Sequence, residues 1–293
     1  MVKRSFARLD VKGFIHSLRI DAYGALFEVM LKYILAPLLR TFYSREDILK
    51  WVDLFNSVLG TERFLFIVLD DARYDVFKSI YSRYLNGDLK PCLVPPPNTY
   101  GWLPKVFSLP EFNNVRVFYA SLGIKTHDIR IGDFIPKNRS VEVYAIKPKR
   151  FEHLGTVLPN EVNEVIKRVG LSGRDIVWYV QPHFPWVCDE ELSLLLMHEV
   201  LVHDFLPPDT IKRALKKYGI SRDRVLKAYY CNMEIALRGA RDLLDYVREQ
   251  GLMYDKIVIT SDHGEMLGEY GLYLHQEYNL PQLTIVPWLE VRL

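Results

Sequence analysis

Three unbroken runs of apolar residues stand out in this 293-residue chain, at 64–69, 176–180 and 257–259. Runs of this length predict buried strands in a mostly parallel sheet that helices cover on both faces. Acids or histidines follow each run. Because the carboxyl ends of parallel strands meet at one edge of a sheet, we expect these polar side chains to converge there. They are Asp70, His183, Asp262 and His263.

Shorter strands and amphipathic helices are expected between these runs. Strands then alternate with helices, which is typical of an α/β sheet flanked by helices. The strand candidates lie at 115–119 and 141–146. Apolar spacing indicates helices at 160–169, 190–203, 209–218 and 222–250.

The first sixty residues are expected to form a helical extension packed on a catalytic domain at 61–293. Apolar residues recur at helical spacing over 14–39, but charges and Pro37 exclude a helix that spans a membrane. Residues 1–40 carry seven Lys or Arg and three acids. Contact of this basic amphipathic helix with a membrane surface is therefore the alternative to packing.

A second helix is expected within this extension. Ser44 and the acids after it resemble a capping box, which predicts a helix from Ser44 through Phe55. Gly60 marks its end and the boundary before the first strand.

The segment after the third run has the residues of a metal site. His275 follows Asp262-His263 at a distance of twelve residues from His263. Carboxylate oxygen and imidazole nitrogen bind divalent ions such as Zn²⁺, and a catalytic ion keeps a position for water or substrate. Three glycines give the loop between the ligands the freedom to fold back. The alternative is a strand end with a capping Asp and two surface histidines.

Three motifs together resemble the alkaline phosphatase superfamily, in its sulfatase and phosphoethanolamine transferase branch. They are Asp-Asp-x-Arg at 70–73, Pro-His-x-Pro at 182–185 and the long Asp-His-Gly-Glu motif at 262–275, which is the specific one. The resemblance covers about 63–293. It implies a central sheet flanked by helices and a metal held by an early Asp and a late Asp-His pair.

The resemblance also implies residue roles. The metal ligands would be Asp70, Asp262 and His263, with Asp71 as an extra ligand. Zn²⁺ is the expected ion, with Mg²⁺, Mn²⁺ or Ca²⁺ as alternatives, and a second ion is left open. His183 and His275 would bind that second ion, stabilise phosphoryl oxygens or protonate the leaving oxygen.

Thr99 is the predicted nucleophile, because the resemblance implies a hydroxyl at a helix start after the first strand. It is the Ser or Thr of the segment 95–104. Coordination to the metal would lower the pKa of its hydroxyl. The helix N-terminus and Asn98 would bind the anionic ester. The alternative is that Asn98 and Thr99 merely end a proline-rich loop.

Two departures from the family pattern limit which reaction and which metal ligands are expected. Sulfatases carry a C-x-P-x-R motif, whereas Cys92 is followed by proline at the wrong spacing and no Arg follows. Sulfate ester hydrolysis by that route is not expected. Glu199 and His203 have helical i, i+4 spacing, but we interpret them as core and surface residues and not as ligands of a second metal.

Composition and cysteine content bear on the expected partners, disulfides and cellular location. Residues are 49% hydrophobic, and the formal net charge of +2 gives no reason to expect a nucleic-acid partner. Cys92, Cys188 and Cys231 are scattered and odd in number, so no disulfide framework is expected. With no signal-peptide layout, this predicts a cytoplasmic protein, with membrane association as the alternative.

These observations predict a metal-dependent hydrolase of phosphate mono- or diesters that forms a phospho-threonine. The substrate would be a phosphorylated small molecule, a glycan or a lipid headgroup. A phosphoryl-group transferase to a sugar or lipid acceptor, a sulfatase-like enzyme and a non-catalytic binding protein that kept the fold are the alternatives.

Overall fold

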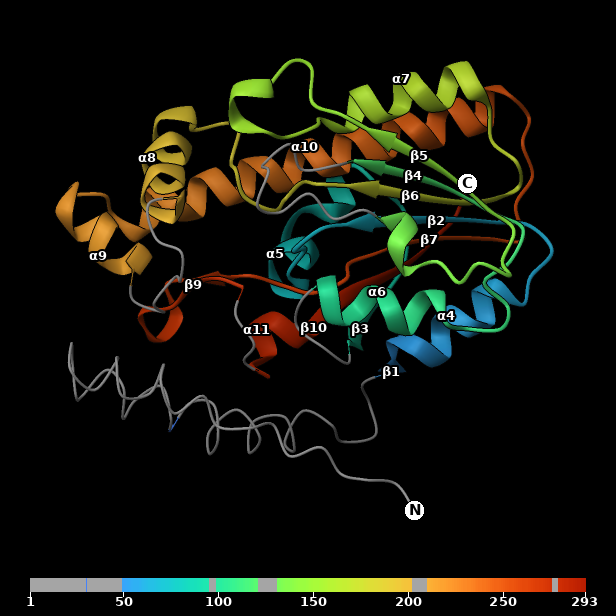
Figure 1. Ribbon diagram of the computed structural model, residues 1–293, viewed down its shortest axis with the longest axis horizontal. Coiled ribbons are helices and arrows are strands. Elements are labelled where there is room, and N and C mark those ends of the chain that lie inside the picture. Colours follow the sequence, from blue (N-terminus) through green and yellow to red (C-terminus); the bar gives the residue numbers. More distant parts are fainter. Residues whose placement is uncertain (1–29, 31–48, 95–98, 121–130, 202–209, 276–278) are drawn as a thin grey trace.

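A computed structural model describes residue 30 and residues 49–94, 99–120, 131–201, 210–275 and 279–293. Its centre is an eight-stranded sheet with the strand order β1-β3-β10-β7-β2-β6-β4-β5 (Figure 1). The strands of this sheet are β1 (Leu49–Lys50), β2 (Phe64–Leu69), β3 (Gly87–Leu93), β4 (Val115–Ala120), β5 (Val141–Ile146), β6 (Arg174–Tyr179), β7 (Lys256–Thr260) and β10 (Ile285–Val291).

The sheet is mostly parallel, as predicted. The pairs of β2 with β6 and β7, of β4 with β5 and β6, and of β1 with β3 are parallel. Strand β10 runs antiparallel to both of its neighbours, β3 and β7. It therefore joins the small β1–β3 portion of the sheet to the larger parallel portion.

Helices cover both faces of the sheet, and its central strand β2 is accordingly apolar on both sides. Alternate side chains of a strand point to opposite faces, so Leu65, Ile67 and Leu69 enter one hydrophobic cluster and Phe64, Phe66 and Val68 enter the other. The first cluster lies under α5 (Tyr74–Ile80), α7 (Pro159–Val169), α8 (Glu190–Leu201), α9 (Thr210–Lys217) and α10 (Arg222–Glu249); the second lies under α4 (Trp51–Leu59) and α6 (Thr99–Phe107).

The remaining elements are short. A hairpin of β8 (Met266–Leu267) and β9 (Tyr273–Leu274) follows β7, and α11 (Pro281–Thr284) precedes β10. Single turns of 3-10 helix occur at Tyr81–Arg83, Ile131–Phe134, Glu152–Leu154 and Glu269–Gly271.

The predicted elements are largely confirmed. The three apolar runs are β2, β6 and β7, and the strand candidates at 115–119 and 141–146 are β4 and β5. The four predicted helices correspond to α7, α8, α9 and α10, although residues 202–209 lie outside the described part of the chain. Strands β3 and β10 were not predicted, because prolines and charged residues interrupt their apolar pattern.

The N-terminal predictions are only partly open to comparison. The helix expected at 14–39 and the capping box at Ser44 lie outside the described residues, apart from Met30. The helix predicted through Phe55 is wrong at its start: Leu49 and Lys50 pair with β3 as strand β1, and α4 begins at Trp51. Gly60 does cap its end. Within the described ranges, no helix has the length and apolar character to cross a membrane.

The expectation about the cysteines is wrong. Cys188 and Cys231 form a disulfide that joins the segment after β6 to α10, while Cys92 is free and buried in β3. The two partners are 43 residues apart in the sequence, so their spacing gave no sign of the pairing. The prediction of a cytoplasmic location relied on unpaired cysteines and loses that support, because disulfides persist mainly in oxidising compartments.

Candidate functional site

The carboxyl ends of β2, β6 and β7 meet at one edge of the sheet and bring the predicted polar residues together. Asp70 and Asp71 directly follow β2, Asp262 and His263 follow β7 after one intervening residue, and His183 lies in the loop after β6. The hairpin after β7 returns His275 to the same place. Three overlapping sets of side chains could each hold a metal ion: Asp70 with Asp262 and His263, Asp70 with Asp71 and His183, and Asp71 with His263 and His275.

Thr99 is the first residue of α6 and lies against the end of β7. Its hydroxyl donates to Oδ2 of Asp262 at 2.8 Å and is 3.1 Å from Nε2 of His263. All three side chains are buried, with exposed fractions of 8% for Thr99 and 0% for the other two. Backbone N–H groups at the start of a helix carry partial positive charge, so an anion bound beside Thr99 would be stabilised.

Asp70 is a buried carboxyl with one polar partner and one open oxygen. The indole N–H of Trp178 in β6 donates to Oδ2 at 3.0 Å, and Oδ1 has no hydrogen-bond partner among the described residues. Burial, with the neighbouring charges of Asp262 and Asp71, raises the pKa of Asp70 well above its ordinary value. A bound cation would remove this penalty, because it favours the charged form of the carboxyl.

Asp71 is surrounded by three imidazoles. Its carboxyl oxygens lie 2.7 Å from Nδ1 of His263, 3.2 Å from Nδ1 of His275 and 3.6 Å from Nε2 of His183. Burial acts to raise its pKa, but the neighbouring imidazoles, His275 above all, outweigh burial and hold the pKa of Asp71 well below its ordinary value. Its backbone has a positive φ of 63°, a left-handed conformation that Asp tolerates better than most residues.

The histidines differ in protonation. Burial lowers the pKa of His183 to about 4, so its ring is neutral at neutral pH. Nδ1 of His183 faces the carbonyl of Phe184, which fixes the proton there and leaves Nε2 as an acceptor. For His263, burial lowers the pKa, but Asp262 and Asp71 together raise it to about 9. The pKa of His275 is also raised well above its ordinary value, against burial, chiefly by Asp71.

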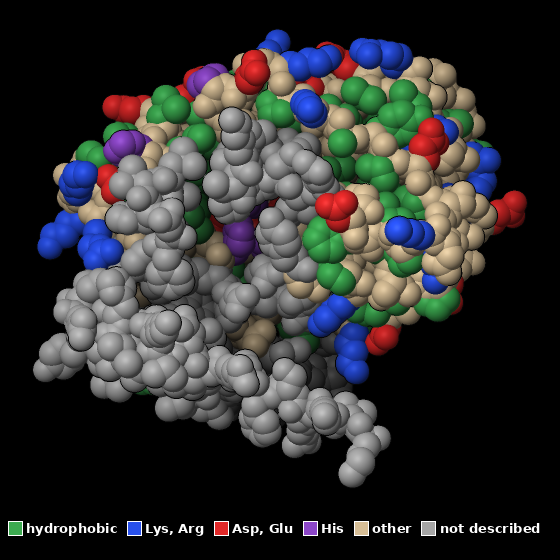
Figure 2. Space-filling model, viewed as in Figure 1, with side chains coloured by type: hydrophobic (Ala, Val, Ile, Leu, Met, Phe, Trp, Pro, Cys, Tyr) green, Lys and Arg blue, Asp and Glu red, His purple; other side chains and the backbone are tan. Residues whose placement is uncertain are grey.

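The site opens toward solvent on the side of His183 and His275. Their side chains are 15% and 29% exposed, whereas those of Asp71 and His263 are fully buried. In Figure 2 a histidine side chain is visible in a hollow near the middle of the face that is shown. A ligand would therefore meet the two outer imidazoles first and the carboxylates behind them.

The donor set fits a divalent cation. Oδ1 of Asp70 is buried and accepts no hydrogen bond from any described residue, and the carboxyl of Asp71 is buried with imidazole nitrogens as its near neighbours. A buried carboxylate without partners is costly, and pairing with a metal relieves that cost. Mixed carboxylate and imidazole donors suit Zn²⁺ and related ions. The side chains that lie close enough together to hold such an ion, in three overlapping sets, are Asp70, Asp71, His183, Asp262, His263 and His275.

Several solved structures are similar to this chain, at TM-scores below 0.5. The C-terminal periplasmic domain of phosphoethanolamine transferase EptC from Campylobacter jejuni is 15% identical, with 83% of this chain and 82% of that chain covered and a TM-score of 0.49. The corresponding EptC domain from Escherichia coli, in complex with Zn, is 11% identical (80% and 74% covered, TM-score 0.48). The phosphonate monoester hydrolase of Agrobacterium radiobacter is 12% identical (78% and 67% covered, TM-score 0.42).

The similarity to the Campylobacter jejuni domain is to a phosphoethanolamine transferase, a kind of protein that the sequence motifs also resemble. At such identities it carries no residue role and no substrate to this chain. No protein-family model matches the sequence, and no curated protein matches it.

Four residues of the site were not predicted from the sequence. Glu265 is fully buried beside His275, and burial with the charge of Asp71 raises its pKa to about 8. The hydroxyl of Ser261 lies 2.6 Å from the carbonyl oxygens of both Leu69 and His263 and accepts from the N–H of Ala72, so it ties the ends of β2 and β7 together. The other two are Trp178, whose indole N–H donates to Asp70, and Tyr229, whose hydroxyl donates to the carbonyl oxygen of Asp71.

Other predicted residues lie apart from the cluster or outside the described residues. Asn98 and His203 lie outside the described residues. Glu199 accepts from Lys217 and Tyr218 on the surface, in line with its interpretation as a structural residue. Arg73 pairs with Asp75 and Glu269, which agrees with the expectation that it bonds to acids of the fold and not to substrate.

Proposed function

We propose that this chain is a metal-dependent enzyme that cleaves phosphate esters with Thr99 as its nucleophile. The observation that carries the proposal is a buried threonine hydroxyl at a helix start, in contact with Asp262 and His263. A hydroxyl becomes a nucleophile at neutral pH when a base or a cation lowers its pKa. The proposed substrates are phosphorylated small molecules, glycans or lipid headgroups.

The proposal assigns the ligands to two positions. Asp70, Thr99, Asp262 and His263 would hold one divalent ion, and a second position would use Asp71 with His183, so that His275 stays available as the acid of the reaction. The neutral ring of His183 presents Nε2 without a proton, which supports a ligand role for it over donation to a phosphoryl oxygen. When bound, the metal would supply positive charge that lowers the pKa of the Thr99 hydroxyl and offsets charge on the phosphoryl oxygens.

In the proposed reaction, Oγ1 of Thr99 attacks phosphorus while its proton passes to Oδ2 of Asp262, which lies 2.8 Å away. The Oγ1–P bond forms as the bond from phosphorus to the leaving oxygen breaks. His275, whose raised pKa keeps it protonated, gives its proton to that oxygen. Neutral His275 then takes a proton from water as the water oxygen attacks phosphorus, the Oγ1–P bond breaks, and Asp262 returns its proton to Oγ1, which releases phosphate and restores the Thr99 hydroxyl.

The same intermediate could pass its phosphoryl group to a hydroxyl of a sugar or lipid in place of water. Transfer and hydrolysis would differ in the second step alone, so the nature of the acceptor decides between them. We propose hydrolysis, because water needs no further binding site beside the outer histidines.

The test uses protein loaded with Zn²⁺ and a panel of aryl phosphate monoesters, diesters and sulfate esters. Thr99→Ala should lower kcat by at least about 10³-fold, as expected for loss of a nucleophile. Thr99→Ser keeps the hydroxyl and serves as the matched control that should retain part of the activity. Mass spectrometry of rapidly quenched reactions should find phosphate on the peptide that contains Thr99.

Two outcomes would contradict the proposal. Wild-type rates in Thr99→Ala would remove the nucleophile, and cleavage of sulfate esters alone would change the substrate class. Addition of sugar or glycerol acceptors separates hydrolysis from transfer, because a transferase would form the phosphorylated acceptor at the expense of free phosphate.

A further inference from the structure

One face of helix α10 contacts the backbone at two points of the candidate site. Tyr229 and Asn232 are three residues apart in α10, a spacing that places both side chains on the same side of a helix. Both have no exposed surface. Tyr229 contacts the turn that carries Asp71, and Asn232 contacts the loop that carries His183. The two contacts together span the gap between these site residues.

The Tyr229 hydroxyl holds the turn after β2. It donates to the carbonyl oxygen of Asp71 at 2.6 Å and accepts from the N–H of Arg73 at 3.0 Å. These two backbone groups flank Ala72, which directly follows the left-handed Asp71 with its φ of 63°. Since a residue keeps such a conformation only where its surroundings enforce it, the hydroxyl fixes the direction in which the Asp71 carboxyl leaves the chain.

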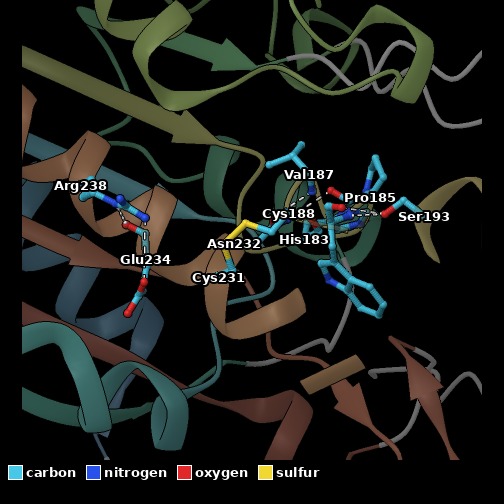
Figure 3. The surroundings of a disulfide bond; sticks show 10 residues. His183, Pro185, Val187, Cys188, Ser193, Cys231, Asn232, Glu234 and Arg238 are labelled. Carbon is cyan, nitrogen blue, oxygen red and sulfur yellow. Dashed lines mark hydrogen bonds and ion pairs between the residues drawn. A yellow bond between two sulfur atoms is a disulfide. The ribbon is translucent and has the colours of Figure 1, made fainter. Parts of the chain in front are cut away.

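Asn232 holds the loop after β6 with every hydrogen-bonding group of its amide. Its Nδ2 donates to the carbonyl oxygens of His183 at 3.3 Å and Pro185 at 3.2 Å, and its Oδ1 accepts from the N–H of Val187 at 3.0 Å. This pattern fixes the orientation of the amide, because an exchanged oxygen would face two carbonyls. Figure 3 shows Asn232 pointing toward the labelled loop residues, next to the disulfide of Cys188 and Cys231.

We propose that Tyr229 and Asn232 are positioning residues that set the separation between Asp71 and His183, and thereby the geometry of the second cation position. This inference depends on the proposed function and deepens it. The two side chains touch no reacting atom; they act through the backbone on a carboxyl and an imidazole that lie 3.6 Å apart. Because α10 is one continuous helix of 28 residues, the two contacts move as a unit.

The chain offers a matched pair of control residues whose side-chain hydrogen bonds reach neither the turn of Asp71 nor the loop of His183. The hydroxyl of Tyr179 donates to Oδ1 of Asn163 at 2.6 Å, and Nδ2 of Asn163 donates to the carbonyl of Gly239 at 2.9 Å. Both side chains are buried. Tyr179→Phe therefore loses a buried hydroxyl as Tyr229→Phe does. Asn163→Asp loses a buried amide donor as Asn232→Asp does.

The experiment compares these four variants with the wild type at a temperature at which all are folded. In Zn²⁺-loaded protein, Tyr229→Phe and Asn232→Asp should lower kcat for an aryl phosphate by about 10- to 100-fold, the range found when groups that orient metal ligands are removed. KM should change little, and the affinity for Zn²⁺ alone should fall in the same two variants. The control pair should show neither effect. Asn232→Ala, which adds no charge, replaces Asn232→Asp if that variant does not fold.

Hydrogen exchange of the metal-free protein provides a readout that needs no activity. Tyr229→Phe should speed exchange of amides at 71–73, and Asn232→Asp should speed exchange at 183–187, while the controls leave both segments unchanged. Equal activity and zinc affinity in test and control variants would overturn the inference and leave the proposed function intact. If the wild type cleaves no phosphate ester, the proposed function fails, and unchanged exchange in both segments would then overturn the positioning role as well.

Discussion

The hydroxyl of Thr99 lies 2.8 Å from Oδ2 of Asp262, although the two residues are 163 positions apart in the sequence. Thr99 follows β3 in the chain and Asp262 follows β7, and these two strands are not neighbours in the sheet. Strand β10 lies between them and pairs with both, with Trp288 opposite Lys90 on one side and Thr260 on the other. This contact of the candidate site thus depends on a strand whose described residues contribute no side chain to it.

Trp178 should control the acidity of Asp70. Its indole N–H donates to the carboxylate, which lowers a pKa that burial raises, so Trp178→Phe should raise the pKa of Asp70 further. A ligand must lose its proton to bind a metal. We therefore expect Zn²⁺ affinity to fall by about 10-fold, the lower end of the range for loss of a group that orients a ligand, and to fall more at pH 6 than at pH 8. Isothermal titration at the two pH values measures both.

Trp102→Phe is the matched control for this substitution. The Trp102 ring packs edge-on against Trp178 at 5.1 Å, yet its indole N–H meets no acceptor among the described residues. It should lose packing without any pH-dependent change in zinc affinity. An identical pH dependence in the two variants would show that packing, and not the hydrogen bond, controls Asp70.

Glu265 should make the metal-free protein less stable as pH rises. Burial and Asp71 raise its folded pKa from 4.5 to about 8, so the folded state keeps a proton that the unfolded state loses. This stabilising contribution is complete below pH 4.5 and disappears as pH rises through about 8. Glu265→Gln carries no titrating proton, so its melting temperature in EDTA should fall less between pH 5 and 8 than that of the wild type.

The exposed Glu62 provides the comparison, since Glu62→Gln should leave the pH profile of the melting temperature unchanged. His263, with a folded pKa of about 9, loses its own contribution between its ordinary pKa of 6.5 and that value. A decline above pH 6.5 should therefore persist in Glu265→Gln. A profile identical to that of the wild type would contradict the assignment of the proton to Glu265.

The disulfide should be detectable by thiol titration and should stabilise the fold. Unfolded protein without reductant should show one free thiol, Cys92, and three after reduction. Replacing Cys188 and Cys231 with Ala opens a loop of 43 residues, and chain entropy predicts a loss of about 4 kcal/mol in the free energy of unfolding. Denaturant titration measures that loss; reductant should then destabilise the wild type but not the double variant.

Much of the fold was predictable because its central strands are buried on both faces. Strands β2, β6 and β7 appear in the sequence as unbroken apolar runs, and the rule that ligands gather at the carboxyl ends of strands located most of the acids and histidines. Strands β3 and β10 contain Pro91 and Pro287, along with charged residues, and so lack that pattern. Their antiparallel pairing could not be read from any local signal.

The residues that support the site were hidden for a different reason. Asn232 and Tyr229 lie in the middle of a long helix, where a buried Asn or Tyr has no sequence feature that separates it from ordinary core packing. Their partners lie 45 and 158 residues away. The same holds for the cysteines, whose pairing depends on where α10 crosses the loop after β6.

The central place of β10 has a consequence for the order of folding. Strands β1 and β3 reach the rest of the sheet through β10, which is the last strand of the sheet along the sequence. Pairing of such distant segments closes long loops and slows folding. Until β10 inserts, β3 is not joined to β7, so we expect the contact between Thr99 and Asp262 to form late in assembly, after the parallel strands have already come together.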